Sequence, residues 1–143
     1  MTDNAATDGA IAPSSEPLSA QSLDASLTVA DARRSTSWYV EVLGFTIDRE
    51  FERGGQLRAV SLRAGAVRIL LSQDDGSKGP ERTKGEGFSL QITTAQDIDS
   101  LAARAKRGGA TFDTEPTDVI GARVFRLRDP DGFRLVISSP RKA

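Results

Sequence analysis

The sequence nearly repeats itself at a spacing of about 65 residues, and this repeat constrains the fold more than any other feature. Four blocks of similar residues recur in the same order. Such order indicates two copies of one supersecondary unit. The matching blocks are residues 26–29 with 89–92 at a shift of 63, 44–50 with 109–115 and 57–63 with 122–128 at a shift of 65, and 68–72 with 134–138 at a shift of 66.

Each copy has the hydrophobic pattern of a strand, a helix and three further strands. In the first copy, Leu27 and Val29 alternate with polar residues, which is the period of a half-buried strand. Asp31 suits the N-cap of the following helix and Gly44 its C-terminal end, while Thr94 is the expected cap in the second copy. We therefore predict an α+β fold of two tandem βαβββ modules with a cleft between them. The expected elements are strands at 24–29, 46–53, 56–63 and 66–72 around a helix that ends at 43, and strands at 87–92, 111–116, 122–128 and 133–138 around a helix at 95–107.

Ahead of the repeat we expect a disordered N-terminal tail. It is rich in Ala, Ser, Thr, Asp and Pro and poor in large apolar residues, so it cannot bury enough surface to offset its ordering entropy. It also lacks the basic start and apolar stretch of a signal peptide, which favours a cytoplasmic protein. The expected boundaries are 1–22 for the tail and 23–143 for a single domain, made of module one (24–72), a linker (73–85) and module two (86–139).

Composition excludes several classes of function. The chain of 143 residues has a net charge of −1, which gives no support for a nucleic-acid surface, and no apolar run approaches a membrane span. Cys is absent, so disulfides and thiol catalysis are excluded. His is absent as well, which removes the commonest metal ligand and the commonest general base. No nucleophile signature is evident among the remaining residues, and we identify no catalytic residue. A metal-free reaction would have to use a base such as Asp24 or a Glu of the cleft, made more basic by desolvation.

Three segments carry a resemblance to a known family. They are LTVAD at 27–31, SWYVEVLGF at 37–45 and the turn DPDG at 129–132, placed in this order within a duplicated unit. Together they resemble the vicinal oxygen chelate superfamily of glyoxalase I, extradiol dioxygenases, fosfomycin-resistance proteins and bleomycin-binding proteins. The resemblance covers about residues 24–139 and implies the tandem βαβββ fold. It does not fix the function.

The resemblance also implies where a metal would lie. In the family's enzymes a divalent metal is held in the cleft by His and Glu from the first and last strands of each unit. Those places fall here on Asp24, Leu70, Gly87 and Val136, and only the first could coordinate a metal through its side chain. Because such sites usually need about three protein ligands, we expect neither a metal nor another cofactor. The alternative is a glyoxalase- or dioxygenase-type enzyme with an atypical carboxylate site, using Asp24 and Glu86.

The strand faces that point away from the helices should line the cleft. Three arginines on these faces favour an anionic or carbonyl-bearing small molecule, because a guanidinium makes bidentate contacts with carboxylate or phosphate. A competing interpretation is that these arginines form ion pairs with Asp24, Asp48, Glu50 or Asp113, or lie at a solvated rim. The predicted ligand-binding residues are Arg68, Arg126, Arg134, Ser26, Ser89 and Gln91.

Trp38 and Tyr39 are expected in the core, although the Tyr39 phenol could serve as a polar handle in a pocket. The sequence thus predicts a metal-independent protein that binds a small molecule, with no demonstrated catalysis. The pocket would lie between the units of one chain or across a homodimer, which is the usual oligomer. A third possibility is an interaction protein whose sheet face is buried by a partner.

Overall fold

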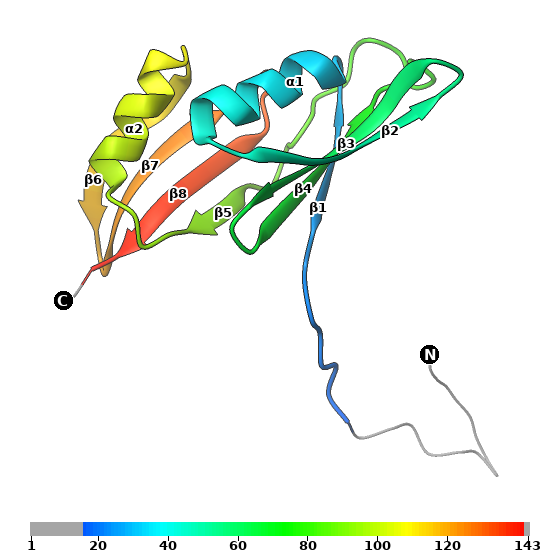
Figure 1. The fold of residues 1–143 in the computed structure, drawn as a ribbon. Helices are drawn as coiled ribbons and strands as arrows, with labels where there is room; N and C mark the ends of the chain where they lie inside the picture. Colours follow the sequence, from blue (N-terminus) through cyan, green and yellow to red (C-terminus); the bar gives the residue numbers. More distant parts are fainter. Residues whose placement is uncertain (1–15, 142–143) are drawn as a thin grey trace.

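The computed structural model describes residues 16–141, which form two four-stranded sheets, each with one helical segment (Figure 1). The order of elements is βαβββ twice, as predicted. In module one, α1 continues directly into a turn of π-helix, η1. The elements are β1 (Ala25–Val29), α1 (Ala32–Trp38), η1 (Tyr39–Leu43), β2 (Thr46–Arg53), β3 (Gln56–Ala64) and β4 (Val67–Gln73), followed by β5 (Leu90–Thr93), α2 (Ile98–Arg107), β6 (Thr111–Val119), β7 (Ala122–Arg128) and β8 (Arg134–Pro140).

The two sheets have equivalent topologies. Their strand orders are β1-β4-β3-β2 and β5-β8-β7-β6, with the first pair of each parallel and the others antiparallel. Ser26 lies opposite Leu70 in the first sheet, and Gln91 lies opposite Val136 in the second. Ser26 therefore corresponds to Gln91, at a shift of 65. The predicted shift of 63 for the first strands was wrong, because a slip of two residues keeps every side chain on its face and the alternating pattern cannot detect it.

The two helices begin with Asp caps. The Asp31 carboxylate accepts hydrogen bonds from the backbone N–H groups of Arg33 and Arg34, and Gly44 ends the helical segment at φ 80°, as expected. The start predicted for α2 was wrong. Asp97, rather than Thr94, is its N-cap, because the Thr94 backbone N–H donates to the β8 carbonyl of Ser138. Within residues 16–141, neither helix is long and apolar enough to cross a membrane.

One hydrophobic core runs through both modules. It contains the helix-facing side chains of the central strands, such as Ile69 and Leu71 in module one and Leu135 and Ile137 in module two. Phe88 falls within the strand predicted at 87–92, where its alternation with Ser89 would turn its side chain toward this core. It instead precedes β5, is 47% exposed and contacts the ring of Phe133 at a centroid distance of 6.1 Å.

The modules meet through their helices, which lie next to each other on one side of the molecule (Figure 1). Arg104 of α2 donates to the carbonyls of Val40 and Glu41, near the end of the first helical segment. Most of the predicted tail lies outside the described residues, and residues 16–24 have no regular secondary structure. Between the modules, residues 74–89 are also without helix or strand, close to the predicted linker.

Candidate functional site

The six predicted ligand-binding residues line two cavities on the sheet faces that point away from the helices. A cavity of about 430 Å³ between β1, β4 and β5 is lined by Arg68, Ser26, Ser89 and Gln91. A second cavity, of about 400 Å³, lies on the sheet of module two. Its lining includes Arg126, Arg134 and, again, Ser89. The two cavities are therefore neighbours, and both are lined by Phe88 and Ser89, just before β5.

In module one, two arginines face each other on the cleft side of the sheet. Arg63 of β3 is the cross-strand partner of Arg68 at the start of β4. The Arg63 side chain approaches a carboxylate, with 3.8 Å between its Nε and Asp48 Oδ1. The pair therefore has one carboxylate for two guanidinium groups. Asp48 lies next to Arg63, so Arg68 is left without a carboxylate partner among the described residues.

Module two repeats this arrangement at the equivalent positions. Arg128 of β7 is the cross-strand partner of Arg134 at the start of β8. Arg128 Nε lies 2.9 Å from Asp113 Oδ2. The repeat thus duplicates a constellation of one aspartate and two arginines, and each copy leaves one positive charge on the cleft side.

Of the competing interpretation, the ion pairs are not formed by the predicted arginines with any described residue, whereas the exposure of Arg126 and Arg134 agrees with a solvated rim. Within residues 16–141, Arg68, Arg126 and Arg134 take part in no salt bridge. Sequence reasoning had not singled out Arg63 and Arg128 as the partners of the two aspartates. The repeat alignment carried the signal, because both the Asp and the Arg recur at a shift of 65.

The residues at the family's metal positions do not fit a metal. Leu70 and Val136 are aliphatic, Gly87 has no side chain, and Asp24 precedes β1. Ser26 and Gln91, which the strand register sets beside Leu70 and Val136, contribute no carboxylate. In the part of the chain that the structure describes, no group of three or more acidic side chains could hold a metal ion. We therefore derive no chemistry through a metal.

The phenol of Tyr39 is not a handle in the cleft. Its side chain is buried, and its hydroxyl donates to Asp129 Oδ2 at 2.8 Å. Burial, reinforced by the neighbouring carboxylate, raises the pKa of Tyr39 far above its ordinary value. Burial also raises the pKa of Asp129, although Tyr39 and the backbone N–H groups of Phe133 and Asp131 donate hydrogen bonds to its carboxylate.

The next aspartate of the same turn joins three parts of the chain. The Asp131 carboxylate accepts from the backbone N–H of Ala30 at 2.8 Å and from the Lys84 ammonium at 3.1 Å. Lys84 also lies 3.3 Å from Asp74 Oδ2. The DPDG turn, a family marker in the sequence, therefore attaches module two and the linker to module one.

Comparison with known proteins identifies the family of this fold. Residues 22–137 match the model of the Glyoxalase/Bleomycin resistance protein/Dioxygenase superfamily. The chain belongs to this superfamily. Among curated proteins, none is significantly similar in sequence.

Several solved structures share the fold of this superfamily member. A glyoxylase/bleomycin resistance protein/dioxygenase domain from Frankia sp. EAN1pec has a TM-score of 0.70 and 26% identity, over 89% of this chain and 96% of that chain. TnmS3, an antibiotic binding protein from Streptomyces sp. CB03234, has a TM-score of 0.65 and 20% identity, over 87% of this chain and 100% of that chain. TioX from Micromonospora sp. ML1 has a TM-score of 0.68 and 20% identity, over 85% and 100%.

Proposed function

We propose that this superfamily member binds a small anionic or carbonyl-bearing molecule on its cleft face, without a metal and without catalysis. The observation that carries the proposal is the pair of equivalent arginines, Arg68 and Arg134. Each stands beside a second arginine that already has the local carboxylate. The neighbouring Arg126 adds a third guanidinium to the same face.

The energetics of the sheet support a functional reason for this arrangement. Like charges directly opposite each other on neighbouring strands destabilise a sheet, by an amount comparable to the roughly 0.2–1 kcal/mol that favourable pairs contribute. The chain has such a pair in both modules. An anion between the strands would remove the repulsion, and a guanidinium offers it two parallel donors. Ser26, Ser89 and Gln91 would supply further neutral hydrogen bonds.

A homodimer would complete the cleft. Every residue of β2 is exposed, and Phe51, on its cleft side opposite Ala59, is 38% exposed beneath the guanidinium of Arg49. A second copy related by a two-fold axis could cover this face. We propose this cytoplasmic dimer, without nucleic-acid or membrane partners, as the working form.

The other two possibilities have less support. The metal-dependent enzyme needs a set of carboxylates that the described residues do not assemble. The pure interaction protein predicts no enclosed pocket and tight association with another chain, and it gives no role to the two open cavities of about 430 and 400 Å³ on the cleft face. TnmS3 has the same fold and is an antibiotic binding protein, which also favours a small-molecule ligand.

The experiment combines native mass spectrometry with calorimetric titration. Mass spectrometry of the untreated protein measures the oligomer, any bound metal and any small molecule carried through purification. Phenylphosphonate and phenylpyruvate then serve as anionic probes, with toluene, which has neither a charge nor a carbonyl group, as the control. We expect a dimer that binds the anions in preference to toluene.

The deciding variant is Arg134→Ala. A charge-assisted hydrogen bond contributes about 1.5–3 kcal/mol, so the variant should bind the anions about 10- to 100-fold more weakly. Its melting temperature should hardly change, since the substitution also removes a like-charge neighbour of Arg128. Arg107→Ala, on the exposed surface of α2, is the matched control and should bind like the wild type. Unchanged affinity in Arg134→Ala, or one divalent metal per chain, would overturn the proposal.

A further inference from the structure

The repeat creates two equivalent junctions between the modules. At each junction, the helix of one module meets the turn between the last two strands of the other. The closed junction is formed by Tyr39 and the β7–β8 turn at 129–132. The open junction is formed by Arg104 of α2 and the β3–β4 turn at 64–66. Arg104 is the residue that corresponds to Tyr39 at the shift of 65.

A phenol ring fills the closed junction. Tyr39 is 0% exposed, and its ring has edge-to-face contacts with Trp38 at 4.9 Å and Phe45 at 5.5 Å between centroids. Its hydroxyl meets Asp129 of the opposite turn. The turn is followed by Phe133, which is also buried. Aromatic side chains thus fill the interior of this junction around Tyr39, with one polar group anchored. An open cavity of about 680 Å³ also lies between Trp38, Glu41 and the turn, but the Tyr39 ring is not part of its lining.

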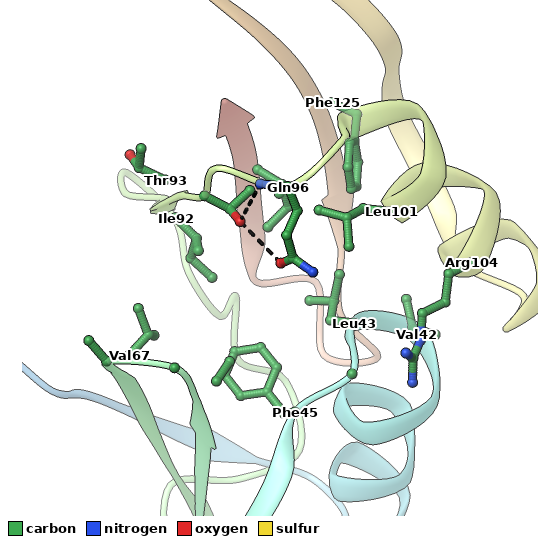
Figure 2. A pocket seen from close by; sticks show the side chains of 16 residues that line it. Val42, Leu43, Phe45, Val67, Ile92, Thr93, Gln96, Leu101, Arg104 and Phe125 are labelled. Atoms are coloured by element: carbon green, nitrogen blue, oxygen red, sulfur yellow. Dashed lines mark hydrogen bonds between the residues drawn. The ribbon is translucent and has the colours of Figure 1, made fainter. Parts of the chain in front are cut away.

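The open junction has no such filling. Its turn consists of Ala64, Gly65 and Ala66, and Val67 stands where the other turn has Phe133. The Arg104 guanidinium is directed to the carbonyls of Val40 and Glu41 and does not fill the space as Tyr39 does. A cavity of about 390 Å³ remains between α2, the turn and β5 (Figure 2). It lies on the helix side of the sheets, and its lining shares with the cleft cavities only Val67 and Ile92.

Apolar side chains form most of the cavity wall, and its polar side chains are Thr93, Thr94, Gln96 and Arg104. Arg104 is the single charged residue in the lining, and its charge is already directed at helix carbonyls. The amide of Gln96 points toward Leu43 (Figure 2). Its oxygen accepts from the Thr94 hydroxyl, whereas its nitrogen donates no hydrogen bond to any described residue. The remaining wall includes partly exposed side chains of the core, namely Leu43, Val67, Ile92 and Leu101.

We propose that the open junction is a second binding site, for a small uncharged aromatic molecule with one hydrogen-bond acceptor. The aromatic body would take the place that the Tyr39 ring has in the closed junction. The acceptor would receive the free N–H of Gln96. The volume is within the range of small-molecule sites, roughly 300–1,000 Å³. A charged ligand is disfavoured because the wall offers no unpaired charge to offset its desolvation.

The test uses the full chain and a fluorescent probe of this chemistry, 6-propionyl-2-(dimethylamino)naphthalene. The probe is uncharged, has a fused aromatic body and one ketone, and emits at shorter wavelength in apolar surroundings. We expect saturable, blue-shifted binding with one site per chain. Gln96→Leu should weaken it about 5-fold, the effect of losing a typical neutral hydrogen bond.

Arg104→Tyr puts into the open junction the residue that fills the closed one. It should weaken probe binding at least about 10-fold, because the new ring and the probe cannot share a close-packed space. Arg107→Tyr, on the same helix but outside the cavity lining, is the matched control and should bind normally. Arg68→Ala and Arg134→Ala, in the cleft, should also bind normally, which separates this site from the proposed anion site.

Three results would overturn the proposal. They are no saturable binding by the wild type, binding that Arg104→Tyr and Gln96→Leu leave unchanged, and binding that Arg68→Ala abolishes. If the Arg104→Tyr variant does not fold, the test is the change in backbone amide NMR shifts of the wild type when the probe is added. Shifts at Gly65, Thr93 and Gln96 would support the site, and shifts confined to the cleft strands would refute it.

Discussion

The closed and open junctions are equivalent in the repeat but differ in how they hold the modules together. At the closed junction, a buried ring and a hydrogen bond between Tyr39 and Asp129 join helix and turn. At the open junction, Arg104 donates hydrogen bonds to the carbonyls of Val40 and Glu41, and a cavity lies between α2 and the turn. A duplicated fold can therefore use one copy of a junction for cohesion and leave the other available for a ligand.

The largest expected effect comes from emptying the closed junction. Tyr39→Ala removes a fully buried ring and leaves the Asp129 carboxylate without its donor, so we expect a loss of about 3–5 kcal/mol in the free energy of unfolding. Urea denaturation measures this loss. A loss below about 1 kcal/mol would mean that the closed junction contributes no more cohesion than the open one.

The equivalent change at the open junction should be much milder. Arg104→Ala removes two hydrogen bonds from an exposed side chain to the carbonyls of Val40 and Glu41. We expect a loss of roughly 0.5–1.5 kcal/mol in the same denaturation experiment. Arg107→Ala is the control for removing a positive charge from the last turns of α2. A loss as large as that of Tyr39→Ala would contradict the contrast between the junctions.

The smallest expected effect is a dependence on pH that belongs to the closed junction alone. Burial raises the pKa of Asp129, so the folded protein holds this proton more readily than the unfolded chain. The stability that this contributes is complete below about pH 4, the ordinary range of an aspartate, and is lost as the pH rises through the folded-state pKa.

Denaturation of the wild type and of Asp129→Asn at several pH values checks this sign. The stability of the wild type relative to the variant should decline as the pH increases from about 4. Ala64→Asn, at the matching position of the open junction, should show no such trend against the wild type. A difference between wild type and Asp129→Asn that grows with pH would mean that the hydrogen bonds to the carboxylate outweigh its burial.

The sequence predicted the elements best where local signals were unambiguous. The strands at 46–53 and 122–128 were predicted with the bounds that the structure has, because Gly-containing turns delimit them. The start of α2 was predicted wrongly, because both Thr94 and Asp97 can cap a helix. Only the pairing of β5 with β8 decides between them. The alignment of the first strands failed for a similar reason, since sheet register depends on a partner strand distant in the chain.

For the candidate site, the sequence predicted only the side of each strand on which a residue lies. Alternation indicated that Arg68, Arg126 and Arg134 point away from the helices, and their exposure or partial exposure agrees with that. Alternation could not indicate with which arginine Asp48 and Asp113 would each form a salt bridge. The partners Arg63 and Arg128 follow from cross-strand geometry, which brings together residues that no local pattern relates.

By itself, the sequence determined the duplicated βαβββ unit and its family, because helix and strand periods and turn residues act over short stretches of chain. Only the tertiary structure decided that Tyr39 meets Asp129 while its counterpart Arg104 leaves a cavity. The two junctions are built from segments that are far apart in the sequence. Whether a side chain fills such a space depends on the direction it takes after packing, and periodicity carries no information on that direction.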